Sequence, residues 1–307
     1  MRILVVGAGS TGGYFGARLV QAGRDVTFLV RPTRAEQLRE RGLSIVSPHG
    51  DATIAPSLVT ADGLHERFDV VLLTVKAPAL DAALEDVAAA IGPDTMILPV
   101  LNGMRQVEAI TARFGTSALV GCACKIATIL DDDGTVVQLT TLQDFAYGEM
   151  NGVRTDRIVR LDQVMRGAGF DARLSSDIAL EMWEKWILLA TVGGITCLMR
   201  GPVGTIVQAP GGRDFIAAFL DEVVAVVSEI GRRPSERFLA AARAQLTDPA
   251  SQQTSSMYRD LVKGRPVEAD QILGDLAARG RSAGVPVPLI GAAYTHLSVY
   301  QSSGRPT

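Results

Sequence analysis

The segment that opens this chain constrains its fold most, because a short apolar run passes directly into closely spaced glycines. The segment reads RILVVGAGSTGGYFG, with Gly7, Gly9 and Gly12 in the spacing GxGxxG. The β-branched run predicts a strand, and the apolar pattern at 12–22 predicts a helix. A strand, a tight glycine turn and a helix in this order are typical of the first unit of a doubly wound parallel sheet.

The glycines also predict a ligand. Gly7 allows the tight turn, Gly9 lets the backbone approach a pyrophosphate, and Gly12 lets helix and strand pack closely. Ser10 and Thr11 stand between the glycines, where the helix N-terminus faces the anion. We therefore expect these five residues to bind a dinucleotide, with a purely structural glycine turn as the alternative.

Short β-branched runs and helical patterns alternate over the first half of the chain, which indicates a parallel sheet with helices on both faces. After RILVVG, the expected strands are DVTFLV, DVVLLTV at 69–75 and TMILPV at 95–100, and the expected helices are 12–22, 34–41, 78–91 and 104–114. The runs SALVGCACKIATIL and TVVQLTT lie on either side of DDDG at 131–134. Because Asp-Gly favours a tight hairpin turn, the two runs are expected to pair as antiparallel strands. We expect this hairpin to close the sheet, followed by a helix near 155–167 and a strand FDARL.

The pattern becomes helical after SSD at 175–177, with breaks at Gly201-Pro202, Gly231 to Pro234, Pro249 and Gly284 to Pro288. A chain of 307 residues also exceeds what one hydrophobic core usually supports, about 250–300 residues. The fold class is therefore α/β with two domains. Residues 1–174 are expected to form a Rossmann-type NADP-binding domain, and residues 175–307 an all-helical domain for substrate and catalysis.

Polar side chains follow three of the expected strands. An NAD enzyme usually places an acid near the end of the second strand, but DVTFLVR ends in Arg31, whose guanidinium suits the 2′-phosphate of NADP. Arg34 could share this role, and a solvated arginine is the alternative. Lys76 in TVKA and Asn102 in LNGM follow the next two strands, where ligands bind in open α/β sheets. We expect both to contact the cofactor.

Composition excludes several other functions. The formal net charge of −3 and the lack of a basic patch argue against nucleic-acid binding. No run of about 18 apolar residues predicts a membrane span, and the N-terminal run is too short for a signal peptide, so we expect a cytoplasmic protein. Three cysteines without CxxC spacing are expected to be core thiols, and no metal site is predicted. The oligomeric state stays open, with a homodimer as one option.

One lysine stands in unusual surroundings. Lys185 lies between the only two tryptophans of the chain in EMWEKWILLA, at the head of an apolar run. Enclosure by apolar neighbours makes an ammonium give up its proton more readily, which suits a general acid. The alternative is a lysine whose amine extends into water.

With these motifs in order, the sequence resembles the ketopantoate reductase (2-dehydropantoate 2-reductase) family over nearly its whole length. The motifs are GAGSTGG, LVR with Arg31, TVKA, LNGM, WEKW, SSMYRD with Ser256 and GRPVEADQILG with Glu268. The resemblance implies NADPH-dependent reduction of a 2-keto acid to a 2-hydroxy acid, as from ketopantoate to pantoate in pantothenate biosynthesis. It implies that Lys185 is the proton donor, that Glu268 and Asn102 assist catalysis, and that Ser256 and Glu268 also bind the substrate with Lys185.

The sequence departs from the family at two positions after this lysine. The family commonly carries asparagines four and eight residues on, where this chain has Leu189 and Gly193, while Thr196 keeps the register. Two amides that could hydrogen-bond a substrate are therefore lost, so a bulkier or more apolar 2-keto acid than ketopantoate is one option. One alternative is a 3-hydroxy acid or opine-type dehydrogenase. Another is an NADPH-binding sensor without turnover, but the retained Lys185 and Glu268 argue against it.

Overall fold

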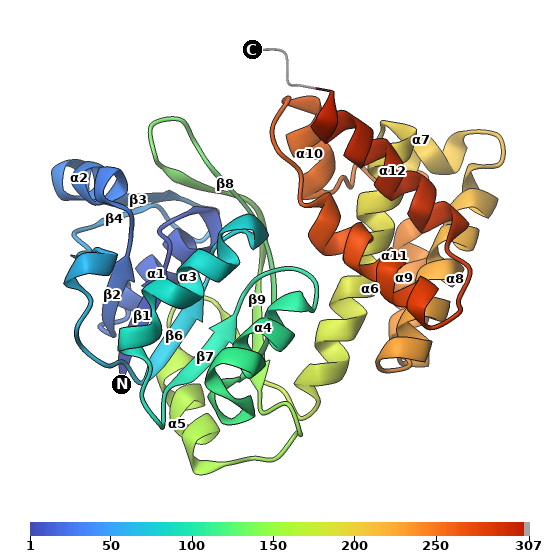
Figure 1. The fold of residues 1–307 in the computed structure, drawn as a ribbon. Coiled ribbons are helices and arrows are strands. Elements are labelled where there is room, and N and C mark those ends of the chain that lie inside the picture. Colours follow the sequence, from blue (N-terminus) through green and yellow to red (C-terminus); the bar gives the residue numbers. More distant parts are fainter. Residues whose placement is uncertain (304–307) are drawn as a thin grey trace. The chain divides into compact units, whose positions relative to one another are not determined.

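The computed structural model describes residues 1–303, so the last four residues of the expected helical domain lie outside the described residues. The chain divides into two compact units. The first holds residues 1–101 and 106–179, and the second holds the short segment 102–105 together with the chain from residue 180 onward. Figure 1 shows the strands of the first unit in blue to green and the helices of the second in yellow to red.

The first unit is built on a five-stranded sheet in the order β5-β2-β1-β6-β7, and each neighbouring pair is parallel. The strands are β1 (Arg2–Val6), β2 (Asp25–Leu29), β5 (Ser57–Val59), β6 (Val70–Leu73) and β7 (Met96–Pro99). The helices of this unit are α1 (Ser10–Gln21), α2 (Pro32–Arg41), α3 (Leu80–Asp86), α4 (Arg105–Phe114) and α5 (Asp156–Met165). This is the predicted doubly wound α/β arrangement.

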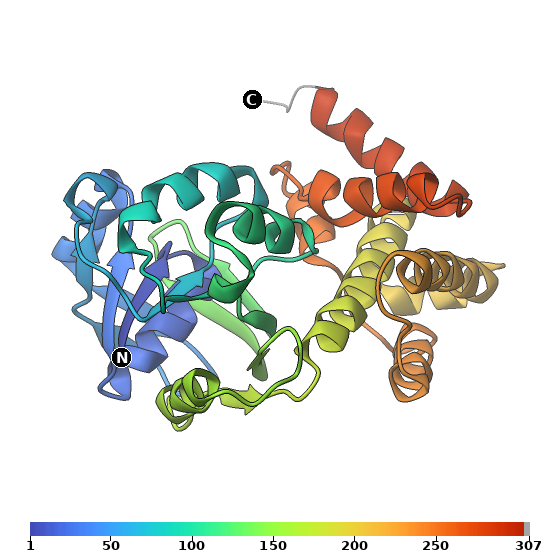
Figure 2. The ribbon, with the colours of Figure 1, turned by 60° about the horizontal axis from the view of Figure 1, so that its bottom comes forward.

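The sheet is buried on both faces because β1 carries apolar side chains at every inner position. Ile3 and Val5 join one core with residues of α1, whereas Leu4 and Val6 join a second core with residues of α3 and α4. Successive side chains of a strand point to opposite faces, so a continuous apolar run needs cover on both sides. Figures 1 and 2 show helices on both sides of this sheet.

The predicted hairpin is present, but its expected place in the first sheet is wrong. Strands β8 (Gly121–Leu130) and β9 (Val136–Gly148) pair antiparallel on either side of the turn at 131–134. They belong to a second sheet in the order β10-β9-β3-β4, with β8 also paired to β9. Its other strands are β3 (Leu43–Val46), β4 (Ala52–Ile54) and β10 (Asp171–Leu174), and the sequence did not predict β3, β4 or the first-sheet strand β5.

The physical reason lies at the edge of the first sheet. The chain touches that edge at a single bridge between Ile97 and Leu119 and then leaves it, because β9 finds a parallel partner in β3. Helix α1 fills the space between the two sheets: Phe15 packs edge-on against Phe145 of β9, with ring centroids 4.8 Å apart. The cysteines are core thiols as predicted, since Cys122, Cys124 and Cys197 are all buried and none forms a disulfide bond.

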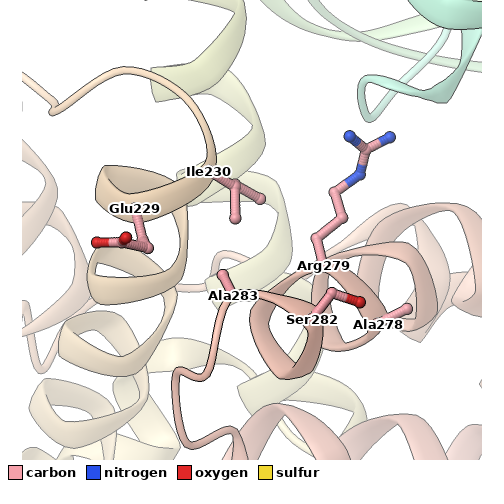
Figure 3. A pocket seen from close by; sticks show the side chains of 6 residues that line it. All are labelled: Glu229, Ile230, Ala278, Arg279, Ser282 and Ala283. Atoms are coloured by element: carbon pink, nitrogen blue, oxygen red, sulfur yellow. The ribbon is translucent and has the colours of Figure 1, made fainter.

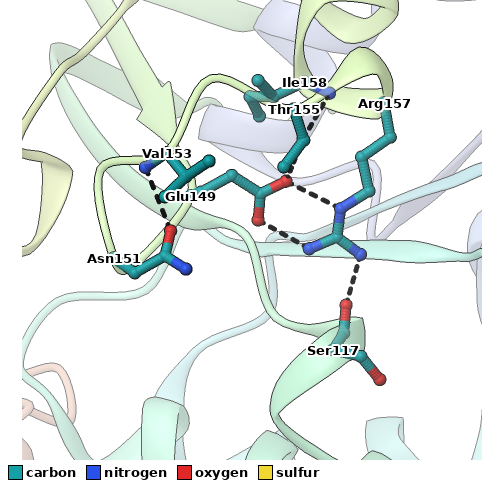
Figure 4. Close-up of polar contacts among 7 residues, drawn as sticks. All are labelled: Ser117, Glu149, Asn151, Val153, Thr155, Arg157 and Ile158. Atoms are coloured by element: carbon teal, nitrogen blue, oxygen red, sulfur yellow. Dashed lines mark hydrogen bonds and ion pairs between the residues drawn. The ribbon is translucent and has the colours of Figure 1, made fainter.

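An ion pair between the buried Glu149 and the partly buried Arg157 stabilises the chain after β9. The guanidinium of Arg157 donates through Nε to Glu149 Oε1 over 2.7 Å and through Nη2 to Oε2 over 2.6 Å. Thr155 Oγ1 also donates to Glu149 over 2.6 Å, and Arg157 reaches the carbonyl of Ser117 (Figure 4). The carboxylate is thus almost completely satisfied within the protein.

The second unit is helical. The four predicted breaks all separate helices, but the breaks at 209–211 and 263–268 were not predicted. Its elements are α6 (Ile178–Met199), α7 (Val203–Gln208), α8 (Gly212–Ile230), α9 (Glu236–Leu246), α10 (Ser256–Val262), the π-helical turn η5 (Asp270–Gly274), α11 (Asp275–Ser282) and α12 (Pro288–Ser302). Helix α6 is apolar around most of its circumference, as expected for a buried central helix. Its hydroxyls are satisfied locally, since Thr191 and Thr196 donate to carbonyls one turn earlier. None of the helices within residues 1–303 combines the length and the apolar character that a membrane crossing requires.

Candidate active site

The glycine loop joins β1 to α1 at the carboxyl end of the central strand. Gly7 has φ +99°, a conformation that favours glycine. A Cβ on Gly12 would lie 2.1 Å from Thr74 Oγ1 and 2.2 Å from the Gly7 carbonyl oxygen, so only glycine fits this close approach. Gly9, in contrast, has no atom within 4 Å of its Cβ position. The loop is therefore tightly packed at Gly12 and open at Gly9. This arrangement would let phosphates approach the backbone at Gly9.

Ser10 and Thr11 form the first turn of α1, whose N-terminus carries the amide donors that a phosphate needs. Thr74, just after β6, donates through Oγ1 to the Val6 carbonyl over 2.8 Å and holds the end of β1. Lys76 is exposed two residues further on. Because β1 and β6 are parallel neighbours, the glycine loop and Lys76 follow the carboxyl ends of adjacent strands.

Two arginines follow β2 and have different surroundings. Arg31 is exposed and caps α2 through its backbone. Arg34 is half-buried, and its Nη2 donates to the carbonyls of Ala8 over 3.2 Å and Gly134 over 3.0 Å. Burial lowers the pKa of the Arg34 guanidinium. Arg34 thus ties the glycine loop to the β8–β9 turn, whereas Arg31 is left accessible.

The segment 102–105, which follows β7 along the chain, belongs to the second unit and contacts η5 within it. The side-chain amide of Gln271, which is buried in η5, donates to the backbone carbonyl of Asn102 over 3.0 Å. Gly103 has φ +86°, and a Cβ there would lie 2.9 Å from the Gln271 carbonyl oxygen. The loop therefore needs both a glycine and this glutamine to seat Asn102. Gln271 was not predicted, because a glutamine in EADQILG resembles an ordinary surface position of a helix.

The same π-helical turn fastens α6 beside Lys185. Trp186 is buried, and its indole Nε1 donates to the Ile272 carbonyl over 3.0 Å. Trp183 stacks on Trp186 with ring centroids 5.6 Å apart, and a Cβ on Gly231 would touch its ring. The two tryptophans therefore pack with each other and anchor α6. Lys185 itself is half-buried, about 100° around the helix from Trp186.

Glu268 precedes this turn and is half-buried, and its backbone carbonyl accepts from the Ile272 amide over 3.2 Å. Its neighbour Asp270 is exposed and accepts from the Tyr294 hydroxyl over 2.8 Å, which is a structural contact. Residues 268–272 thus link three of the predicted features. Glu268 lies two residues before the turn, the Asn102 backbone is bound by the turn, and the helix of Lys185 is anchored to it.

The remaining predicted residue, Ser256, is the exposed first residue of α10. Its neighbour Ser255 makes the structural contacts: its hydroxyl accepts from the Tyr258 amide over 2.9 Å and lies 3.0 Å from Thr196 Oγ1 of α6. Met257 is buried, and a Cβ on Gly193 would lie 2.3 Å from its Cε. The SSM motif thus packs against α6 two turns beyond Lys185.

A separate shallow pocket of the helical unit contains none of the predicted residues. Figure 3 shows its lining, which consists of Glu229, Ile230, Ala278, Arg279, Ser282 and Ala283. Its cation is already paired, because Arg279 Nε lies 3.0 Å from Asp275 Oδ2 and the guanidinium lies 6.0 Å from the Trp186 ring centroid. This pocket has the character of a surface hollow beside a structural ion pair.

Comparison with known proteins agrees with this arrangement. The family described as ketopantoate reductase PanE/ApbA matches residues 3–152, and its C-terminal counterpart matches residues 177–301. An uncharacterized oxidoreductase of Bacillus subtilis, YkpB, is 34% identical over 98% of this chain and 99% of its own. A 2-dehydropantoate 2-reductase of Mesorhizobium japonicum is 28% identical over 95% of each chain.

Solved structures give the same result. A crystal structure of 2-dehydropantoate 2-reductase from Geobacter metallireducens is 28% identical and superposes with a TM-score of 0.87, covering 97% of this chain and 99% of that one. A D-mandelate dehydrogenase, solved with NADH and anilino(oxo)acetate, shares the fold at 21% identity with a TM-score of 0.88, covering 99% of each chain. The chain therefore belongs to the ketopantoate reductase family of dinucleotide-dependent oxidoreductases.

Proposed function

We propose that this protein uses NADPH to reduce the ketone of a 2-keto acid, ketopantoate or a related compound, to a 2-hydroxy acid. The observation that carries the proposal is the contact set of the π-helical turn. Gln271 binds the Asn102 loop and Ile272 binds Trp186, one residue from Lys185. One short segment thus contacts the backbone of Asn102 and the helix of Lys185 and begins two residues after Glu268, which supports a shared site.

Each residue has a role that its chemistry allows. The bound nicotinamide supplies a hydride to the carbonyl carbon of the substrate. The carbonyl oxygen then becomes an alkoxide, which Lys185 stabilises and protonates through Nζ. Glu268 orients the ammonium, Asn102 has both a donor and an acceptor to fix its ligand, and Ser256 offers an exposed hydroxyl to the substrate.

The phosphates of the cofactor are assigned to the glycine loop. Gly7, Gly9 and Gly12 bring the backbone close, Ser10 and Thr11 present the first amides of α1, and Lys76 adds a cation at the next strand end. The exposed Arg31 is assigned to the 2′-phosphate, because a guanidinium binds phosphate through charge-assisted hydrogen bonds. Arg34 stabilises the glycine loop by donating a hydrogen bond to the Ala8 carbonyl.

The direct test is to follow NADPH absorbance with the purified protein across a panel of 2-keto acids that includes ketopantoate. We expect NADPH consumption with at least one of them and a 2-hydroxy acid as the product. NADPH binding without consumption on the whole panel would contradict the proposal and favour a sensor that binds the cofactor without turnover.

A further inference from the structure

One face of α6 leads away from Lys185 and is apolar. Leu189 and Gly193 follow Lys185 at intervals of four residues, so all three lie on the same side of the helix. Helical side chains lean toward the N-terminus, so the Leu189 side chain covers the surface over the turn of Lys185. Leu189 is half-buried. If Lys185 binds the ketone oxygen of a substrate, Leu189 is therefore the next residue on this face that the substrate side chain would contact.

The next turn of this face, at Gly193, is covered by the side chain of Met257. Gly193 has no side chain, and Met257 occupies the place: a Cβ on Gly193 would lie 2.3 Å from Met257 Cε. Met257 is 2% exposed, so it is packed in position. A polar side chain at 193 could enter only by displacing this methionine. Met257 therefore covers Gly193, so this face of α6 carries no polar side chain at 189 or 193.

Two hydroxyls beside this face, those of Thr196 and Ser255, are already satisfied. Thr196 donates to the Val192 carbonyl over 2.6 Å, and its hydroxyl also lies 3.0 Å from that of Ser255. Ser255 in turn accepts from the Tyr258 amide over 2.9 Å. A substrate hydroxyl that replaced water beside Thr196 and Ser255 would lose hydrogen bonds to water and gain none from these two groups.

We propose that the preferred substrate is a 2-keto acid whose side chain is a branched or aromatic hydrocarbon without a hydroxyl group, and that Leu189 and Met257 determine this preference. The proposal rests on the proposed function, because it assumes that Lys185 protonates the ketone oxygen. In this proposal the substrate side chain contacts the apolar face of α6, and the carboxylate and ketone of the substrate contact the polar site residues.

A matched pair of substrates tests the proposal. Trimethylpyruvate has the carbon skeleton of ketopantoate and lacks only its hydroxyl group. An apolar site disfavours an added hydroxyl by up to ~10²-fold, whereas a site that hydrogen-bonds the hydroxyl rejects the analogue lacking it by ~10⁴–10⁵-fold. We expect kcat/KM for trimethylpyruvate to exceed that for ketopantoate by roughly 10-fold to 100-fold. Equal values, or a preference for ketopantoate, would overturn the proposal while leaving the proposed function intact.

Failure of the proposed function gives a different result, since neither compound nor any other 2-keto acid would then consume NADPH. The variant Leu189→Asn should move the ratio of the two kcat/KM values toward ketopantoate by roughly 10-fold or more. Leu198→Asn is the matched control, because Leu198 is a half-buried leucine of α6 about 180° around the helix from Leu189. It should leave the ratio unchanged.

A second variant guards against poor folding of the first. Gly193→Asn combined with Met257→Ala restores an amide and removes the thioether that would collide with it. It should shift the ratio in the same direction as Leu189→Asn. If both variants reduce 2-keto acids with the ratio of the unmodified protein, the apolar face does not determine the substrate.

Discussion

Gln271 donates from its side-chain amide to the backbone carbonyl of Asn102 over 3.0 Å, across 169 positions of the sequence. The bond is part-buried, and breaking it leaves the carbonyl without this partner at a cost of about 1–3 kcal/mol. We expect Gln271→Leu to lower kcat/KM by about 5-fold to 100-fold, because the Asn102 loop would no longer be held in place.

The control for this prediction is Gln138→Leu. Gln138 is also a buried glutamine that donates to a carbonyl, that of Leu142, but it lies in the second sheet of the first unit. Both variants should lower the free energy of unfolding, measured in urea, and only Gln271→Leu should change the KM for NADPH or substrate. If Gln138→Leu lowered kcat/KM as much, the loss would reflect stability and not the position of Asn102.

Lys185→Ala should separate cofactor binding from chemistry. The predicted phosphate contacts lie on Gly9, Gly12 and Arg31, so NADPH affinity should be nearly unchanged, measured by fluorescence titration. Loss of a general acid should lower kcat by roughly 10²-fold or more. Lys185→Arg should not restore the rate, because guanidinium holds its proton too firmly to donate it. Lys263→Ala, at an exposed lysine of the same unit, should have normal turnover; normal turnover of Lys185→Ala as well would show that Lys185 is structural.

The fold could be predicted where local pattern and burial coincide. The apolar run Arg2–Val6 predicts a strand buried on both faces, and the structure places alternate residues of it in two cores. The hairpin around 131–134 was also predicted, but not its sheet, because a hairpin fixes the pairing of its own strands and nothing beyond them. The three-residue strands at 52–54 and 57–59 are too short to give a clear alternating pattern.

Some residues of the candidate site could be predicted because they follow strands directly. Lys76 follows from the rule that ligands bind at the carboxyl ends of parallel strands. Gln271 could not be predicted in this way, because its role depends on a contact with a loop that is distant in the sequence. The π-helical turn that carries it also has no characteristic spacing of residues that a sequence would reveal. The capping role of Ser255, beside the exposed Ser256, also depends on a tertiary contact, the one with Thr196 on α6.

Arg31 should set the preference between the two dinucleotides. A charged contact to phosphate contributes about 1.5–3 kcal/mol, so Arg31→Ala should weaken NADPH binding about 10-fold to 100-fold and leave NADH binding nearly unchanged. Arg34→Ala should weaken both, because Arg34 holds the Ala8 carbonyl of the glycine loop. Arg39, exposed on the same helix, provides the control. Equal affinities for NADH and NADPH in the unmodified protein would contradict the assignment.

The ion pair of Glu149 and Arg157 should make stability depend on pH. Burial alone would raise the pKa of the Glu149 carboxyl, but the hydrogen bonds from Arg157 and Thr155 outweigh it, so the pKa lies below its ordinary value. A lowered carboxyl pKa stabilises the folded state above the unfolded-state pKa of about 4.3, and this contribution is lost as the pH falls through the folded-state value. Glu149→Gln should therefore lower the free energy of unfolding at neutral pH by about 1–3 kcal/mol.

The difference between the unmodified protein and Glu149→Gln should shrink as the pH falls below about 4, because the unmodified carboxyl then becomes neutral as well. Urea unfolding at a series of pH values measures it. Glu85→Gln is the control, since Glu85 also pairs with an arginine, Arg113, but is exposed and screened by solvent. It should change stability little at any pH. A Glu149→Gln effect as small as that of Glu85→Gln at neutral pH would mean that the buried pair contributes no more than a surface one.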